Sequence, residues 1–129
     1  MSYLTELPLT AIAARIADGS VSSEAVTAGC LDRIERLDAG INAFQAVSAE
    51  RALEQARAAD TLRKTGRPLP LLHGVPLAHK DMFYRQGEES TCGSIIRRGW
   101  TAPATADVLR RLDGAGAVTL GRLNMSEFA

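Results

Sequence analysis

The sequence is short of aromatic residues and of cysteine, and its charges cancel. Aromatic side chains make up 5% of the 129 residues, so a core must be built mainly from leucine, isoleucine, valine and alanine. Two cysteines, Cys30 and Cys92, are too few for a disulfide framework, so we expect a reducing, cytoplasmic setting. The 15 basic and 15 acidic residues give a formal net charge of zero, so charge provides no reason to expect binding to nucleic acid or to an anionic membrane.

Long hydrophobic runs are missing as well. The longest apolar stretches fall far short of the roughly 20 residues that a membrane-spanning helix needs. The start of the chain, Met1 to Glu6, has neither the basic residues nor the apolar stretch of a secretory signal. The apolar fraction of 46% is nevertheless enough for a globular core, and the length predicts one domain at most.

Helical periodicity dominates the chain up to residue 66. Thr10, and then Ser22 or Ser23, stand where helix N-caps are expected, and Gly19 and Gly40 stand where these two helices should end. The second helix carries an apolar stripe at helical spacing, Val26, Cys30, Ile34 and Leu37. Because Cys30 belongs to this stripe, we interpret it as a core residue rather than a nucleophile.

Strands and helices alternate further along the chain. Residues 42–47 predict a short strand, and Ser48 can cap a third helix that ends near Gly66. The prolines of Arg67-Pro68-Leu69-Pro70 then break the helical pattern. Three further elements are expected: a strand over 75–79, a helix from Thr105 or Asp107, and a strand over 117–120.

This order of elements predicts an α/β fold. We expect N-terminal helices over residues 1–66, followed over residues 67–129 by the first strands of a mixed sheet flanked by helices. Pro76 predicts an early or edge position within its strand, because proline cannot donate to the ladder of a central strand.

Lys80 is the residue that the strand at 75–79 delivers, and Asp81 follows it. Lysine is rarely buried, and an apolar setting lowers the pKa of an amine. A lysine that acts as a base near neutral pH needs a pKa about 3 below its usual value of about 10.4. The alternative is that Lys80 lies at a strand end and reaches water along its flexible stem.

Several other patterns do not indicate a site. Gly114-Ala115-Gly116 follows a helix and precedes a strand, which is the reverse of a dinucleotide-binding loop. His73 and His79 flank a strand without a cysteine cluster, which argues against a metal site. Ser94 lies on a glycine-bearing loop, where it can serve an active site or bond its own turn. Cys92 could be a reactive thiol, although no neighbouring feature lowers its pKa.

Four segments, in order, resemble the amidase signature family. Residues 72–81, Leu-His-Gly-Val-Pro-Leu-Ala-His-Lys-Asp, are similar to the strand that carries the family's catalytic lysine. Residues 90–94 resemble its small-residue loop, and residues 106–118 resemble its next helix and strand. Residues 121–129 resemble its Gly-Lys-x-Asn-Met-x-Glu-Phe-Ala segment. The resemblance covers nearly the whole chain and implies a partial amidase signature fold.

The resemblance implies hydrolysis of carboxylic amide C–N bonds, or transfer of amide-derived ammonia, through a Ser–cis-Ser–Lys triad. Lys80 matches the lysine of that triad, and no metal or organic cofactor is implied. The two serines of the family lie downstream of the segment that ends at Ala129, so neither is in this sequence. Ser94 and Ser126 match other motif positions and do not replace them.

These comparisons with the family lead to four expectations. Residues 1–129 are the N-terminal part of a single amidase domain and are inactive alone. The parent enzyme acts on a small-molecule amide. Neither nucleic acid nor a membrane is a direct partner, but open sheet edges favour self-association. The alternatives are an amidase subunit of a tRNA-dependent glutamyl/aspartyl amidotransferase and a non-catalytic structural remnant.

Overall fold

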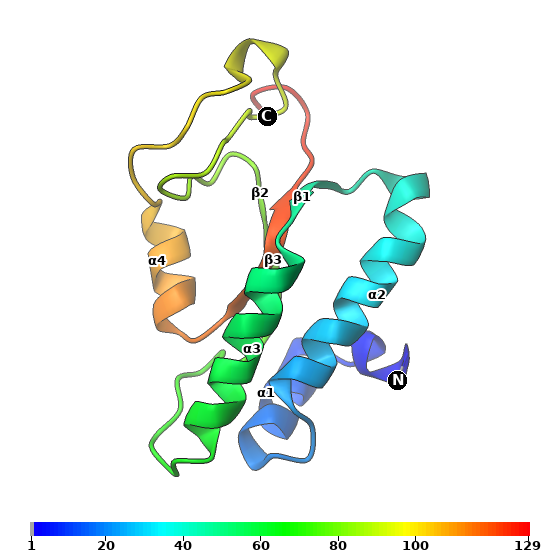
Figure 1. The fold of residues 1–129 in the computed structure, drawn as a ribbon, viewed down its shortest axis with the longest axis vertical. Coiled ribbons are helices and arrows are strands. Elements are labelled where there is room, and N and C mark those ends of the chain that lie inside the picture. The colour runs from blue at the N-terminus through cyan, green and yellow to red at the C-terminus, as the bar shows by residue number, and fades with distance from the viewer. Residues whose placement is uncertain (1) are drawn as a thin grey trace.

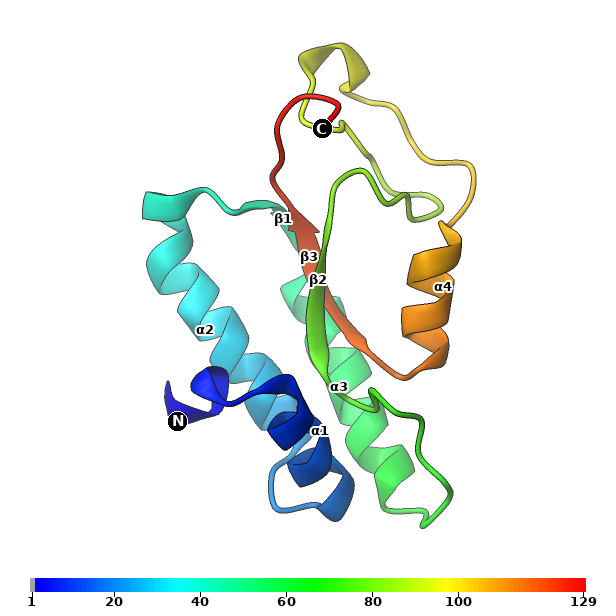
Figure 2. The ribbon, with the colours of Figure 1, turned by 180° about the vertical axis from the view of Figure 1, so that it is seen from behind.

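The computed structural model describes residues 2–129, which fold into helices around a small sheet. The helices are η1 (Ser2–Glu6), α1 (Leu9–Asp18), α2 (Ser23–Ile41), α3 (Ala49–Arg63), η2 (Ile95–Arg97) and α4 (Asp107–Gly114), where η marks a 3-10 helix. The strands are β1 (Phe44–Val47), β2 (Pro76–Lys80) and β3 (Val118–Leu123). The strands lie between α4 and α2, and α3 covers one face of them (Figures 1 and 2). The predicted α/β class is confirmed.

The sheet is mixed, as expected, with the strand order β1-β3-β2. β2 runs parallel to β3 from the pair Pro76 and Val118 to the pair Lys80 and Leu123, and β1 runs antiparallel to β3. Pro76 is the first residue of an edge strand, where its missing N–H costs no ladder hydrogen bond. The outer edges of β1 and β2 pair with no other strand among the described residues, so self-association through them stays a prediction.

Two small clusters of buried side chains form the core. One joins the N-terminal helices to the start of the lysine strand through Leu4, Ile16, Val26 and Val75. The other joins α3 to β3 through Ala52, Ala56, Val118 and Leu120. Cys30 packs against both clusters, and burial raises the pKa of its thiol. Its interpretation as a core residue is therefore confirmed, and a thiol with a raised pKa is a poor nucleophile.

The helix ends correct two details of the sequence analysis. α1 begins at Leu9 rather than after Thr10, because the carbonyl of Pro8 accepts hydrogen bonds from the backbone N–H groups of Ala11 and Ile12. α2 does not end at Gly40 but continues to Ile41, and Asn42 forms the left-handed C-cap with φ 56°. Asparagine tolerates this conformation, so the glycine was not needed there.

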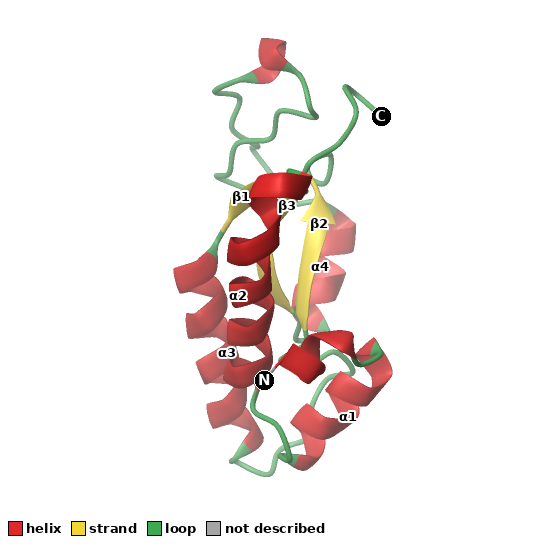
Figure 3. Ribbon diagram, turned by 90° about the vertical axis from the view of Figure 1, so that its right-hand side faces the viewer, coloured by secondary structure: helices red, strands yellow, loops and turns green. Residues whose placement is uncertain are grey.

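The two long helices α2 and α3 lie side by side, and both run along the sheet (Figure 3). Their packing rests partly on a polar contact, since Asp60 of α3 accepts hydrogen bonds from the backbone N–H groups of Ser23 and Glu24 at 2.8 and 3.0 Å. A carboxylate at the start of α2 also complements the helix dipole. No helix within residues 2–129 is long and apolar enough to cross a membrane.

Ser22 is the cap of α2 that we expect to matter for stability. Its hydroxyl oxygen accepts a hydrogen bond from Ala25 N at 3.0 Å, whereas Ser48, at the same position of α3, makes no such bond. We predict that Ser22→Ala lowers the free energy of unfolding by about 1 kcal/mol. Ser48→Ala is the matched control and should change it by less than about half of that. Urea unfolding of both variants checks this, and equal losses would contradict it.

Candidate functional site

The candidate site lies where β2 and β3 end together. Lys80 is the last residue of β2 and is paired in register with Leu123, the last residue of β3. The loop over residues 90–94 and the C-terminal segment over residues 124–129 meet at this same end of the molecule (Figure 1). The fold thus brings together three of the four segments that carry the family resemblance.

Lys80 is less buried than the sequence predicted. In β2 only His79 is fully buried, and the other residues, Lys80 included, are partly exposed. The Lys80 amine makes no hydrogen bond or ion pair with the part of the chain that the structure describes. The cause is that β2 is an edge strand whose outer side is open. Lys80 is therefore held through its backbone, and its catalytic role stays a prediction.

Asp81 is the buried charge of this site, and the sequence analysis did not assign it a role. Its side chain is completely buried. Oδ2 accepts hydrogen bonds from Thr91 N at 2.9 Å and from Thr91 Oγ1 at 2.8 Å, and Ser90 Oγ donates to the Asp81 carbonyl. The Lys-Asp dipeptide was the available signal, because a carboxylate that directly follows a strand residue in a fold this small needs partners.

Arg122 of β3 provides the countercharge. Its Nε lies 3.0 Å from Asp81 Oδ1, and the two atoms are paired by charge, since neither forms an aligned hydrogen bond with the described residues. Arg122 also contacts Glu88 at 3.3 Å, and Glu88 in turn contacts Arg51 of α3 at 2.6 Å. These ion pairs link both strand ends to α3 and to the loop that precedes residue 90.

Arg85 extends the same group of charges to α4. It donates to both carboxylate oxygens of Asp113 at 2.7 and 3.1 Å and to Thr119 Oγ1 at 3.2 Å. The bidentate pair with Asp113 is the main cause that raises the pKa of Arg85. Arg85 therefore stays charged and fixes α4 against β3.

His79 is buried beside these charges. Its Nε2 forms no hydrogen bond with the described residues. Burial is the first cause that lowers its pKa, and the nearby Arg85 is the second. His73 lies before the other end of the strand, where its Nε2 is 2.9 Å from the carbonyl oxygen of Ala59. Among residues 2–129 no three histidine, cysteine or acidic side chains form a cluster that could hold a metal.

The loop over residues 90–94 is bound to the C-terminal segment. Ser94 Oγ donates to Glu127 Oε1 at 2.6 Å, and Phe128 N donates to the Cys92 carbonyl at 2.9 Å. Ser94 thus bonds neither its own turn nor a free substrate site through this donor. Cys92 is buried, which argues against a reactive thiol. The hydroxyl donors of the loop are all used in structural contacts, so the loop supplies no activated nucleophile.

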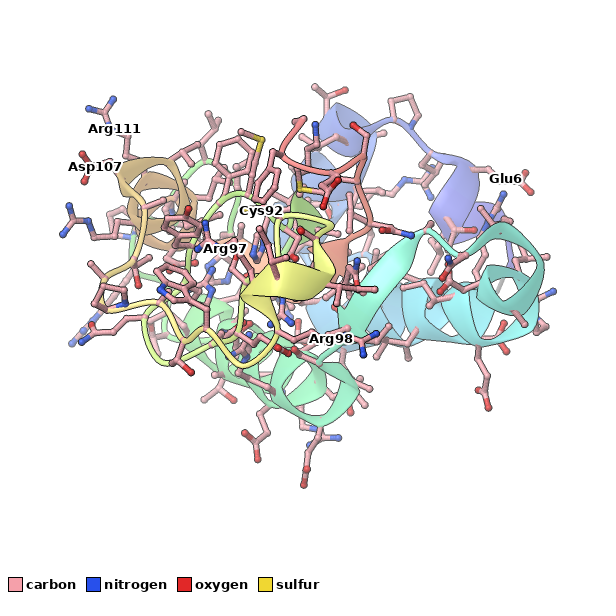
Figure 4. All side chains as sticks on the ribbon, turned by 90° about the horizontal axis from the view of Figure 1, so that it is seen from above. Glu6, Cys92, Arg97, Arg98, Asp107 and Arg111 are labelled. Carbon is pink, nitrogen blue, oxygen red and sulfur yellow. The ribbon has the colours of Figure 1, made fainter. Side chains whose placement is uncertain are left out.

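An aromatic clamp holds the next part of this region. Arg97 lies over the rings of Trp100 and Tyr84, with its guanidinium carbon 4.0 and 5.2 Å from their centroids, and its NH1 donates to the Tyr84 hydroxyl. Seen from above, Cys92, Arg97 and Arg98 gather around η2 (Figure 4). Gly114-Ala115-Gly116 instead forms the turn from α4 into β3, as its position between a helix and a strand predicted.

Gly93 is required by the close approach of the loop to the C-terminal segment. Its φ is +72°, and a Cβ there would lie 2.6 Å from the carbonyl oxygen of Met125. Gly99 has a similar φ of +77° with nothing within 4 Å, so it isolates the backbone strain. We predict that Gly93→Ala lowers the free energy of unfolding by about 1–3 kcal/mol more than Gly99→Ala does. Hydrogen exchange of the Phe128 amide should also speed up in Gly93→Ala alone. Equal effects would refute the contact.

The lowered pKa of His79 predicts a pH-dependent stability. The unfolded chain takes up a proton near the ordinary pKa of 6.5, whereas the buried imidazole resists it. Its contribution is therefore complete above 6.5 and is lost as pH falls through the lower folded pKa. Urea unfolding between about pH 7 and 5 should show a smaller loss for His79→Gln than for the wild type. His73→Gln should keep the wild-type difference that His79 causes, and a parallel decline in all three would contradict this origin.

Known proteins match this chain along almost all of its length. The Amidase family matches residues 25–129. A subunit of the glutamyl-tRNA(Gln) amidotransferase of Pseudomonas entomophila (strain L48) is 49% identical over 124 residues, which are 96% of this chain and 26% of that protein. This chain thus spans about a quarter of the length of the curated relatives it matches.

Solved structures agree with the sequence matches. The native peptide amidase from Stenotrophomonas maltophilia superimposes with a TM-score of 0.89 at 33% identity, over 100% of this chain and 27% of that one. A vestigial protein complex that reveals the origins of an s-triazine catabolic enzyme gives a TM-score of 0.91 at 41% identity, over 95% of this chain and 27% of that one. The matches in sequence and in fold agree, and the chain belongs to the amidase signature family.

Proposed function

We propose that this chain is the lysine-bearing N-terminal part of an amidase that hydrolyses carboxylic amide C–N bonds through a Ser–cis-Ser–Lys triad, with Lys80 as its lysine. The observation that supports this most is the position of Lys80. It ends a strand whose register with β3 is fixed, and it lies at the end of the sheet where the loop and the C-terminal segment meet. Its amine has no partner among the described residues, so it is free to take a proton.

The proposed chemistry divides the work between this chain and residues outside it. One serine attacks the amide carbonyl, and the second passes its proton toward neutral Lys80 and returns one to the leaving amine. Backbone N–H groups stabilise the oxyanion. Both serines lie outside the sequence, and the hydroxyl donors of Ser90, Thr91 and Ser94 are already engaged. We therefore propose that residues 1–129 form one part of a single amidase domain and are inactive alone.

A second candidate function is that of the amidase component in a tRNA-dependent amidotransferase. The support is the 49% identity to a component of a glutamyl-tRNA(Gln) amidotransferase. Such an enzyme would need a partner protein and would pass the ammonia to a tRNA-bound substrate. Co-purification of a second protein, or ATP-dependent transamidation, favours this candidate, whereas turnover of a small free amide without ATP favours the hydrolase. A non-catalytic remnant would instead show a cooperative, monomeric melt of residues 1–129 without any activity in a longer chain.

Replacement of Lys80 tests the proposed base. The sequence has two lysines, and the other, Lys64, is exposed at the C-cap of α3, so Lys64→Ala is a matched control. In a longer chain that joins these residues to the serine-bearing part, Lys80→Ala should lower kcat by about 10²–10⁴-fold. Lys64→Ala should leave kcat unchanged. A loss below about tenfold for Lys80→Ala makes the role of a base untenable.

The purified 129-residue chain provides the second arm of this experiment. It should hydrolyse amides no faster than buffer does, because the nucleophile is missing. Turnover by this chain that Lys80→Ala abolishes would overturn its inactivity.

A further inference from the structure

We propose that Asp81 is a positioning residue whose buried carboxylate locks the end of the lysine strand to the loop over residues 90–94, and thereby sets the direction in which Lys80 presents its amine. The contacts of Asp81 stand on their own. Their value for catalysis rests on the proposed function of Lys80.

The first step of the argument is that Asp81 contacts the loop through both its backbone and its side chain. Thr91 approaches Oδ2 with its amide and its hydroxyl at 2.9 and 2.8 Å, and Ser90 donates to the Asp81 carbonyl. A carboxylate that accepts two such bonds holds the loop in one orientation, because both donors belong to one residue. The loop cannot shift without breaking both.

The second step is that the buried charge of Asp81 is balanced by a closed group of side chains. Three arginines face three carboxylates across β2, β3, α3 and α4; the group is Arg51, Arg85, Arg122, Asp81, Glu88 and Asp113. A charge buried as deeply as that of Asp81 needs such partners, since an unpaired charge in the interior is strongly unfavourable. The group therefore fixes Asp81 from the side opposite the loop.

The third step connects Asp81 to Lys80. Asp81 N donates to Leu123 O at 3.1 Å, and Lys80 O accepts from Phe83 N at 3.0 Å, so the backbone is tied on both sides of the Lys80 side chain. His79 is paired in register with Arg122, and Asp81 contacts Arg122. Because successive residues of a strand point to opposite faces, Lys80 points away from this group of charges. The charges hold the strand from behind and leave the amine on the open face.

The contacts outside the group explain why Lys80 needs this support. Lys80 is partly exposed at the end of an edge strand and makes no polar side-chain contact of its own with the described residues. A base must lie within hydrogen-bond reach of the proton it takes, and a misplacement of about 1 Å is costly. In this structure only the backbone can set that position, and Asp81 is its nearest side-chain anchor.

Asp81→Asn in the 129-residue chain tests the proposal directly. The amide keeps the size of the side chain but removes its charge. The Thr91 amide should exchange its hydrogen about ten- to hundredfold faster, the effect of losing a hydrogen bond to a charged group. The Val118 amide, which donates to Val75 O, reports whether the core stays folded. Asp32→Asn is the matched control, because Asp32 also pairs with an arginine, Arg36, but on the exposed face of α2.

The position of the lysine amine needs its own readout, and the composition provides one. In a chain labelled with ¹³C-lysine, only Lys64 and Lys80 give Cε resonances. Asp81→Asn should shift and sharpen the Lys80 resonance as the strand end loosens, while the Lys64 resonance stays in place. A merely structural role of Asp81 would destabilise the fold without moving Lys80 while the core is still folded, and that result would overturn the proposal.

Thr91→Val keeps the test decisive if Asp81→Asn does not fold. It removes one hydroxyl donor to Asp81 and leaves every charge in place, and Thr101→Val, ten residues further along where the side chain is exposed, is its control. We expect a Lys80 shift in Thr91→Val alone, and no shift in either variant would refute the proposal. A Lys80 shift together with full activity of Lys80→Ala would instead support the positioning and overturn the proposed base.

Discussion

The burial of one carboxylate, that of Asp81, organises this end of the molecule. A completely buried aspartate can stay charged only if donors and a countercharge surround it. Thr91 supplies the donors and Arg122 the countercharge, and these two residues lie on segments that are far from each other in the sequence. The strand of Lys80, the loop after it and the final strand therefore come together to satisfy a single charge.

The choice between arginine and lysine follows the same logic. Thirteen of the 15 basic residues are arginine, and every basic partner in the buried group of charges is an arginine. Arginine stays protonated and binds carboxylates in fixed geometry, whereas the amine of lysine can lose its proton. An arginine framework around one free lysine thus separates the charges that hold the fold from the group that could carry chemistry.

Much of the fold could be read from local signals. The caps at Ser22 and Gly19, the strand at 75–79 and the turn at Gly114 to Gly116 follow from rules that act over a few residues, and the structure agrees with them. The errors at Thr10 and Gly40 arose because another residue nearby, Pro8 or Asn42, could also end or start a helix. Local rules give the type of each element more reliably than its last residue.

The sequence by itself determined the elements, the family and the place of Lys80 at the end of a strand, because hydrophobic period and motif order are written along the chain. Only the tertiary structure showed that Lys80 is partly exposed, that Ser94 is engaged by Glu127, and that Asp81 is the buried centre of the site. These facts depend on contacts between residues up to about 40 positions apart, such as Asp81 with Arg122. Burial and pairing of charge are properties of the packed chain, and no local pattern of residue types encodes which partner a charge will meet.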